Sequence, residues 1–295
     1  MRQTRFLKIP LGYWLILPLF LFSSLVLIYP VVSTAYLSLF DQRIIGTEAP
    51  FVGLDLFKKV LTNSDVHSAF IRSLAWTFGN VIVNNTVAMI VALLLFQRFR
   101  GHSILESVIL IPWIIPNVIA AVIWRYMLHP TLGVVDYIFV SLGLVEDPLM
   151  FLAATSQALP TIIGVNVWTF FGLRALIILA ALLGISEELF DAAKVDGAGP
   201  FQRFIHIIWP AITPVMAVVV LLGGFQTFNK VAIVWLFTRG GPSDATTTLP
   251  VLIYQKAYLS FRTSEAAVLS VVMALLLGGV AWLYFRMQPA EEELV

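Results

Sequence analysis

Long apolar segments, separated by short polar connectors, dominate the pattern of this chain. A helix that spans a bilayer needs about 20 mostly apolar residues. The runs that reach this length predict six spanning helices, at residues 14–39, 73–96, 105–127, 155–183, 212–237 and 266–285. The first run follows Arg2, Arg5 and Lys8. It is longer than the apolar stretch of about 7 to 15 residues in a signal peptide, so we interpret it as a retained helix.

Composition agrees with this pattern. Hydrophobic residues make up 59% of the chain and charged residues only 12%, which is far from the balance of a water-soluble domain. We therefore expect an all-α integral membrane protein whose residues 1–295 form a single transmembrane domain in contact with lipid. A formal net charge of +1 gives no basic surface for nucleic acid. The absence of cysteine excludes disulfides and thiolate metal sites, and no other metal-ligand spacing is present.

Six spans place both termini on the same side of the membrane, together with the connectors 97–104 and 184–211. The other side carries the connectors 40–72, 128–154 and 238–265. Basic residues are nearly balanced between the two sides, with a small excess on the side of the termini. The short basic connector around Arg98 and Arg100 and the basic N-terminus carry the most weight in the positive-inside rule. We therefore expect cytoplasmic termini.

The apolar pattern is interrupted at residues 186–210 by a charged segment that contains two glycines. Its sequence predicts two short helices, the first capped by Ser186 and the second beginning at Pro200. Gly197 and Gly199 supply the corner between them, because glycine accepts a positive φ. The segment is either a docking loop or an amphipathic stretch that lies in the headgroup layer.

This segment resembles the EAA loop of ABC importer permeases. The resemblance rests on Asp191-Ala192-Ala193, then Gly197, then Ile207-Ile208-Trp209-Pro210, at the spacing of that motif. Two positions depart from the family pattern, with Asp191 in place of glutamate and Trp209 in place of leucine.

Further motifs extend the resemblance to the carbohydrate-uptake permeases, in particular to the first permease of the maltose type in a shorter, six-helix form. They are Ile111-Pro112-Trp113-Ile114-Ile115-Pro116 with the following Trp124-Arg125-Tyr126-Met127, Thr238-Arg239-Gly240-Gly241-Pro242, and Thr246-Thr247-Thr248-Leu249-Pro250. The resemblance implies the fold of a type I ABC importer permease, with a cytoplasmic coupling helix, in the cytoplasmic membrane of a bacterium or archaeon.

The resemblance also implies a mechanism and partners. A coupling helix would lie in a groove of a cytoplasmic ATPase dimer, a second homologous permease would complete the path, and an extracytoplasmic solute-binding protein would deliver the solute. The chain has no Gly-x4-Gly-Lys-Ser/Thr loop, so ATP and Mg²⁺ would belong to the ATPase and this chain would be a transport subunit without catalytic residues. The residues expected to couple are Asp191, Ala192, Ala193, Gly197, Phe201, Phe204 and Ile205.

Polar side chains within the spans are candidates for solute binding, because such side chains usually face the interior of a bundle. A sugar would need polar groups for its hydroxyls and an aromatic ring for its C–H faces. Positions that match the family's solute-binding stripes are Asn166, Thr169, Phe170, Leu173, Gln226, Thr227, Asn229 and Lys230. Hydrogen bonding between helices is the alternative role for these residues. Snorkelling to the membrane surface is the alternative for Lys230, and for Arg174 we expect either snorkelling or a contact with a helix carbonyl.

Two other functional classes fit less well. The four histidines lie near or outside the ends of the spans, and no catalytic constellation lies within a span, which argues against an intramembrane enzyme. An ion-coupled secondary transporter usually has carboxylates within its spans, and the interiors of the predicted spans lack them. The expected solute is a disaccharide or a short oligosaccharide, and glycerol 3-phosphate or another polyol is the alternative.

Overall fold

The computed structural model describes residues 11–42, 49–97, 99–145 and 149–287. The chain divides into two compact units. The terminal unit comprises Met1–Asn63 and Ile253–Val295, and the central unit comprises Ser64–Leu252. Regular structure in the described residues is helical, apart from one β-bridge between Phe40 and Phe51. The single permease domain predicted for residues 1–295 remains a prediction. Four of the basic residues used to orient the chain, Arg2, Arg5, Lys8 and Arg98, lie outside the described residues.

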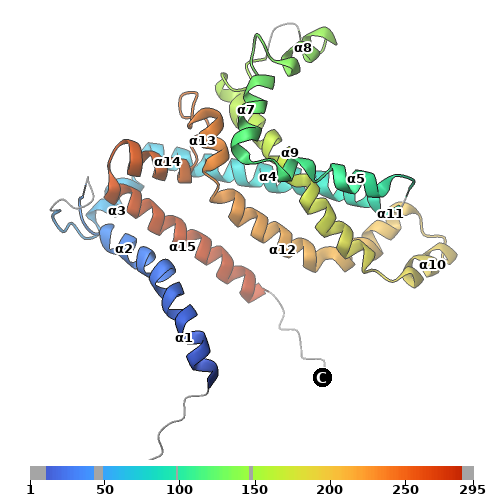
Figure 1. Cartoon of the computed structure of the whole chain (residues 1–295), viewed down its shortest axis with the longest axis horizontal. Helices are drawn as coiled ribbons and strands as arrows, with labels where there is room; N and C mark the ends of the chain where they lie inside the picture. The colour runs from blue at the N-terminus through green and yellow to red at the C-terminus, as the bar shows by residue number, and fades with distance from the viewer. Residues whose placement is uncertain (1–10, 43–48, 98, 146–148, 288–295) are drawn as a thin grey trace, which may run out of the picture. The chain divides into compact units, whose positions relative to one another are not determined.

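The terminal unit contains the first and the last of the long apolar helices (Figure 1). Its elements are α1 (Leu11–Ser23), a π-helical turn (Ser24–Ile28), α2 (Tyr29–Leu37), α3 (Asp55–Leu61), a second π-helical turn (Gln255–Leu259) and α15 (Thr263–Met287). Helix α15 packs against α2 and α3. The backbone amide of Gln42 donates a hydrogen bond to Ser264 Oγ at 2.9 Å, and a part-buried ion pair joins Lys256 to Glu265 at 2.6 Å. These contacts fix the beginning of α15.

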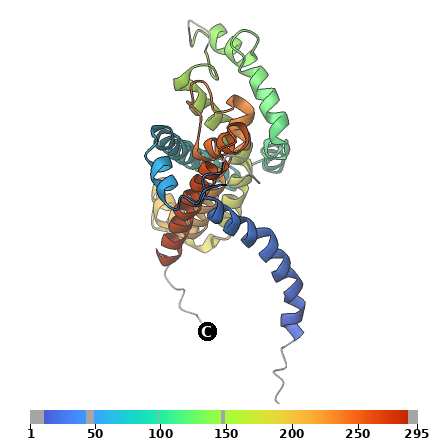
Figure 2. The same cartoon turned by 90° about the vertical axis from the view of Figure 1, so that its left-hand side faces the viewer.

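The central unit is built on three long helices that pack side by side, α4, α9 and α12 (Figures 1 and 2). Its elements are α4 (Ser64–Phe96), α5 (His102–Val108), α6 (Ile111–Ile114), α7 (Asn117–Met127), α8 (Val134–Ser141), α9 (Thr155–Leu183), α10 (Glu187–Val195), α11 (Pro200–Arg203), a π-helical turn (Phe204–Ile208), α12 (Trp209–Phe228), α13 (Ala232–Thr238) and α14 (Leu249–Tyr254).

Five helices of the described chain are long and apolar enough to cross a membrane, or six if one bent pair counts as a single span. Helix α9 has the predicted bounds, whereas α4 begins before the predicted residue 73. Helix α11, the π-helical turn and α12 form one continuous apolar helix, Pro200–Phe228. This helix ends before residue 237, the predicted end of the fifth span.

The third predicted span, 105–127, is not one straight helix. It is broken between α6 and α7, and the helical segments on either side, His102–Ile114 and Asn117–Met127, meet at 94°. The break lies at Ile115, which is extended (ψ 124°) and directly precedes Pro116. Proline disfavours the helical conformation in the residue before it. Pro116 therefore breaks the third predicted span into two helical segments.

Small residues allow the helices of the central unit to approach closely. Ala88 and Ala92 on α4 and Ala175 on α9 are fully buried in one apolar cluster with larger neighbours such as Ile178. Gly172 on α9 faces the end of α5, where a Cβ atom at this position would lie 1.9 Å from the carbonyl oxygen of Ile109. Close packing of small residues is typical of helices in membranes, and here it brings α9 close to α4 and to the end of α5.

Candidate functional site

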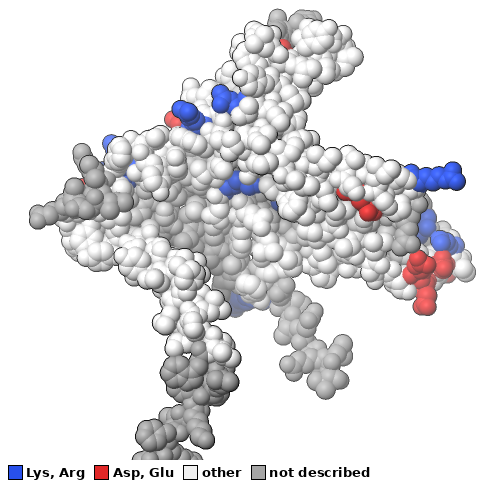
Figure 3. All heavy atoms as spheres, in the orientation of Figure 1, with Lys and Arg blue, Asp and Glu red and all other residues white. Residues whose placement is uncertain are grey.

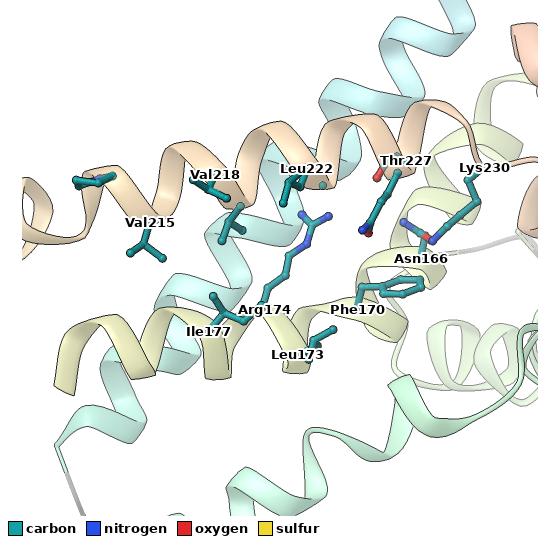
Figure 4. Close-up of a pocket in the computed structure, with 14 residues that line it drawn as sticks. Asn166, Phe170, Leu173, Arg174, Ile177, Val215, Val218, Leu222, Thr227 and Lys230 are labelled. Atoms are coloured by element: carbon teal, nitrogen blue, oxygen red, sulfur yellow. The ribbon is translucent and has the colours of Figure 1, made fainter. Parts of the chain in front are cut away.

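A cavity of about 560 Å³ lies between α9 and α12 in the central unit (Figure 4). Its size falls within the range of about 300 to 1,000 Å³ that is usual for small-molecule sites. Side chains from α9, from α12 and from the residues that follow α12 line it, and they are Asn166, Phe170, Leu173, Arg174, Ile177, Pro214, Val215, Val218, Val219, Leu222, Gly223, Gln226, Thr227 and Lys230. One end is therefore polar and the other is a valine- and leucine-rich wall.

Asn166 organises the polar end. Its Nδ2 donates to Asn80 Oδ1 of α4 at 2.6 Å, and its Oδ1 accepts from Lys230 Nζ at 3.0 Å. Asn80 in turn donates to the backbone carbonyl of Trp76 at 2.7 Å. Trp76 Nε1 donates to the carbonyl of Thr227 at 2.9 Å, which ties the end of α12 to α4. This chain of hydrogen bonds orients the amide of Asn166 and, through it, Lys230.

Lys230 follows the end of α12 and extends over the ring of Phe170, with Nζ 3.6 Å from the ring centroid. A cation over an aromatic face contributes about 0.5–2 kcal/mol, depending on how far it is desolvated. Figure 4 shows Lys230 directed from the end of α12 toward Asn166 and Phe170 on α9. The snorkelling alternative places this ammonium at the membrane surface, whereas the structure holds it at the cavity.

Arg174 also lines the cavity. Its side chain extends from α9 toward α12 (Figure 4), where a Cβ at Gly223 would lie only 2.6 Å from Nη2. The Nη1 atom is buried and has no hydrogen-bond partner among the described residues. An arginine in the middle of a spanning helix costs about 3 kcal/mol. From the sequence we expect Arg174 to snorkel or to meet a helix carbonyl, but the structure places its guanidinium in the cavity. Gly223 has no side chain and so leaves room for the guanidinium beside α12.

The cavity brings together most of the residues proposed for solute binding. Asn166, Phe170, Leu173, Gln226, Thr227 and Lys230 line it. Two others lie outside it: Thr169 is buried with its hydroxyl donating to the carbonyl of Val165 at 3.0 Å, and exposed Asn229 donates to the carbonyl of Phe225 at 2.9 Å. Neither side chain is among the residues that line the cavity. Solute binding remains a prediction for all eight.

The candidate list did not include Arg174 or the apolar wall on α12. A signal for Arg174 was present, because Asn166, Phe170 and Arg174 follow one another at spacings of four residues and so share a face of α9. The wall has a similar signal, since Val215, Val218 and Leu222 repeat at spacings of three and four residues. Their apolar character is equally typical of a lipid-facing stripe, which is why sequence alone could not single them out.

The charged segment 186–210 lies at the end of the central unit that carries α10 and α11 (Figure 1). Ser186 caps α10 by accepting a hydrogen bond from the amide of Glu188 at 3.3 Å, and Gly197 makes the corner with φ +76°. Pro200 is in the first turn of α11, and the amide of Gly199 donates to Gln202 Oε1 at 2.8 Å. The predicted cap and helix start are confirmed, and so is the positive φ at Gly197, whereas Gly199 has a φ of −71°, which any residue can adopt.

The second helix of this segment is not a separate element, because it runs through a π-helical turn into α12. One continuous helix therefore connects the corner to the cavity wall. Among the residues expected to couple, Asp191, Ala192, Gly197, Phe201 and Ile205 are exposed, whereas Ala193 and Phe204 are partly buried. Figure 3 shows acidic and basic side chains gathered over this end of the unit. Large apolar side chains lie among them, with Val195 at 89% and Phe201 at 74% exposure.

Known proteins resemble the chain over most of its length. It is 31% identical over 252 residues to the trehalose/maltose transport system permease protein MalF of Thermococcus litoralis, which covers 85% of both chains. It is 29% identical over 279 residues to the sn-glycerol-3-phosphate transport system permease protein UgpA of Pectobacterium atrosepticum, covering 94% of this chain and 93% of the relative.

A solved structure shares the fold. A chain in the crystal structure of a bacterial ABC transporter involved in the import of the acidic polysaccharide alginate superposes with a TM-score of 0.80 over 94% of both chains, at 22% identity. The profile of the family described as "Binding-protein-dependent transport system inner membrane component" matches residues 84–288, which include α9, the charged segment, α12 and the cavity between them. The chain thus belongs to the family of inner membrane components of binding-protein-dependent transport systems and is a transport subunit rather than an enzyme.

Proposed function

We propose that this chain is one of two permease subunits of an ATP-driven importer and that its solute is a sugar, either a disaccharide or a short oligosaccharide. The cavity between α9 and α12 is the observation that carries the proposal. It combines the amides of Asn166 and Gln226 with the ring of Phe170, and such a mixture suits hydroxyl groups and C–H faces at once. Relatives named for trehalose and maltose and for alginate support a carbohydrate.

A second, homologous permease completes the path. Only part of a translocation path can be lined by α9 and α12, and a pathway that closes and opens needs a second wall that moves against the first. The valine- and leucine-rich wall on α12 would face the solute in one state and the second permease in the other. The two subunits form a heterodimer in the cytoplasmic membrane.

The segment 186–210 receives motion from a cytoplasmic ATPase dimer, which holds the ATP and Mg²⁺. Exposed Leu189, Val195 and Phe201 supply apolar contacts for a groove, and the charges around them supply specificity. Because α11 continues into α12, a displacement of this end by ATPase closure moves the wall of the cavity. In this proposal the segment lies on the cytoplasmic side, and both termini lie on the same side because the chain has six spans.

An extracytoplasmic binding protein delivers the solute to the opposite end of the path. The family is described as binding-protein-dependent, and a related alginate transporter has been crystallised with an alginate pentasaccharide-bound periplasmic protein. The binding protein would set most of the selectivity, and the cavity would add a second selection.

Reconstitution tests the proposal. The chain is purified with the second permease, the ATPase and the binding protein that are encoded beside it, and uptake into proteoliposomes is measured with labelled maltose and with the sugar retained by the binding protein. ATP-dependent uptake that vanishes when the ATPase is omitted is expected. Uptake by this chain alone, driven by an ion gradient, would instead indicate a secondary transporter.

Glycerol 3-phosphate or another polyol is the second candidate. The relatives named for sn-glycerol 3-phosphate, at 29% identity, favour it. Replacing labelled maltose by labelled glycerol 3-phosphate in the same proteoliposomes separates the two candidates.

A further inference from the structure

We propose that the solute carries an anionic group, a carboxylate or a phosphate ester, and that Arg174 and Lys230 bind this group in the cavity between α9 and α12. This inference rests on the proposed function and narrows its substrate class. Three observations support the inference: both charged residues in the cavity are cations, each cation has hydrogen-bond donors without a partner among the described residues, and the walls beside Arg174 are apolar.

The charges that line the cavity have one sign. Arg174 and Lys230 are its ionisable residues, and no Asp or Glu is present among the described residues that line it. The ion pairs of Asp191 with Lys194 and of Glu265 with Lys256 lie outside the cavity. Figure 3 shows basic atoms in the otherwise largely uncharged middle of the central unit. Two cations in one cavity repel each other unless an anion lies with them.

Each cation is held at the cavity but keeps hydrogen-bonding capacity. Lys230 has three donors, of which one is directed to Asn166 Oδ1 at 3.0 Å. Arg174 has five donors in a planar fork that matches the two oxygens of a carboxylate or a phosphate. Its Nη1 is buried without a hydrogen-bond partner among the described residues. Buried donors that lack a partner in a protein are usually completed by a ligand or by water.

The walls around the cations increase the attraction for an anion. Ile177, Val218, Val219 and Leu222 line the cavity beside Arg174, and charges interact more strongly among apolar groups than in water. A neutral sugar would satisfy the donors but would leave both positive charges uncompensated. The alternative source of negative charge is an Asp or Glu of the second permease, and the experiments below separate the two.

The first experiment identifies the charge of the solute. The binding protein encoded with the chain is purified without denaturation, and the solute that it retains is analysed by mass spectrometry. A sugar acid or a sugar phosphate supports both the proposed function and this inference. A neutral sugar leaves the proposed function intact and overturns the inference, whereas an anionic compound that is not a sugar overturns the proposed sugar and leaves the inference intact.

The second experiment tests the residues in the complete transporter. ATP-dependent uptake of a uronate disaccharide, glycerol 3-phosphate and maltose is compared in proteoliposomes for the wild type and for Arg174→Met, Lys230→Met and Arg174→Lys. We expect an anionic probe to be taken up best, at least a tenfold loss of this uptake in each Met variant, and partial recovery in Arg174→Lys. The two anionic probes show whether the group is a carboxylate or a phosphate.

A matched control removes a cation elsewhere. Lys59 lies on an exposed face of α3, outside the cavity. The Lys59→Met variant should leave the preference for anionic probes unchanged. Co-purification of the second permease is measured for every variant. One outcome would show that the cation at position 174 pairs with the second permease and would overturn the inference. In this outcome the second permease no longer co-purifies with Arg174→Met but still co-purifies with Arg174→Lys, and Arg174→Lys shows no preference for an anionic probe. Maltose uptake that exceeds both anionic probes overturns it as well.

Discussion

The ammonium of Lys230 lies 3.6 Å from the centroid of the Phe170 ring. Between these residues the chain runs through the C-terminal part of α9, the charged segment and the whole of α12, and the two meet at the polar end of the cavity. The ring holds the ammonium beside Asn166 and also offers a flat apolar surface to a solute. The contact therefore joins the two walls of the cavity at the place where we expect solute selection.

Phe170→Leu should weaken this selection. The variant removes a cation–π contact that is worth about 0.5–2 kcal/mol and frees Lys230 to leave the cavity. We expect the apparent KM for ATP-dependent uptake to rise while the ATPase activity without solute is retained. Phe170→Tyr, which keeps the ring, is the matched control and should remain close to wild type. An unchanged KM in Phe170→Leu would remove the ring from the solute path.

Gly223→Ala should displace Arg174. The added methyl would lie 2.6 Å from Nη2, which must shift. Gly224→Ala is the control on the next residue, where the added methyl would have Val81 Cγ2 as its nearest neighbour from another helix, at 3.9 Å. Both substitutions raise helix propensity by about 1 kcal/mol, so a difference between them reports on the guanidinium. Uptake should fall in Gly223→Ala and persist in Gly224→Ala. Equal uptake in the two variants would contradict a role for the position of Arg174.

Gly172→Ala should destabilise the fold itself. Its methyl would approach the carbonyl oxygen of Ile109 to 1.9 Å, and overpacking of this kind costs about 1–3 kcal/mol or more. Gly164→Ala on the same helix has nothing within 4 Å of the added methyl and should be neutral or slightly stabilising. Thermal unfolding in detergent checks the prediction, which fails if the two variants unfold at the same temperature.

Gly197→Val should separate ATP hydrolysis from transport. Space is not the limitation, because no atom lies within 4 Å of an added Cβ; the limitation is the φ of +76°. A β-branched residue adopts that conformation only with strain, so the corner between α10 and α11 must change. Gly197→Asn is the control, since asparagine tolerates a positive φ. We expect the solute transported per ATP hydrolysed to fall in the Val variant and to be largely kept in the Asn variant.

Local causes explain what the sequence could predict. The apolar runs predict long helices because a helix needs nothing beyond its own residues to satisfy its backbone in lipid. Ser186, Gly197 and Pro200 act through the conformation of their own backbone or of adjacent residues, so the cap, the corner and the start of α11 were predictable. The break before Pro116 has the same local origin.

Tertiary contacts explain the features that could not be predicted from the sequence. Thr169 and Asn229 have suitable side chains, but neither lines the cavity, and each donates a hydrogen bond to the carbonyl four residues before it, that of Val165 or Phe225. Arg174 turns into the cavity because Gly223, on a helix far along the chain, leaves room for its guanidinium. Such directions depend on which helices pack together, and the helical period alone does not determine that.

The central claim is that solute passes through the cavity between α9 and α12, and cysteine labelling tests it most directly. The chain has no cysteine, so Gln226→Cys within the cavity and Asn229→Cys outside it are single reporters. Labelling by a membrane-impermeant maleimide is measured in the complete transporter with and without the transported solute. We predict that solute slows modification at position 226 but not at position 229. Equal rates with and without solute at position 226 would contradict the account.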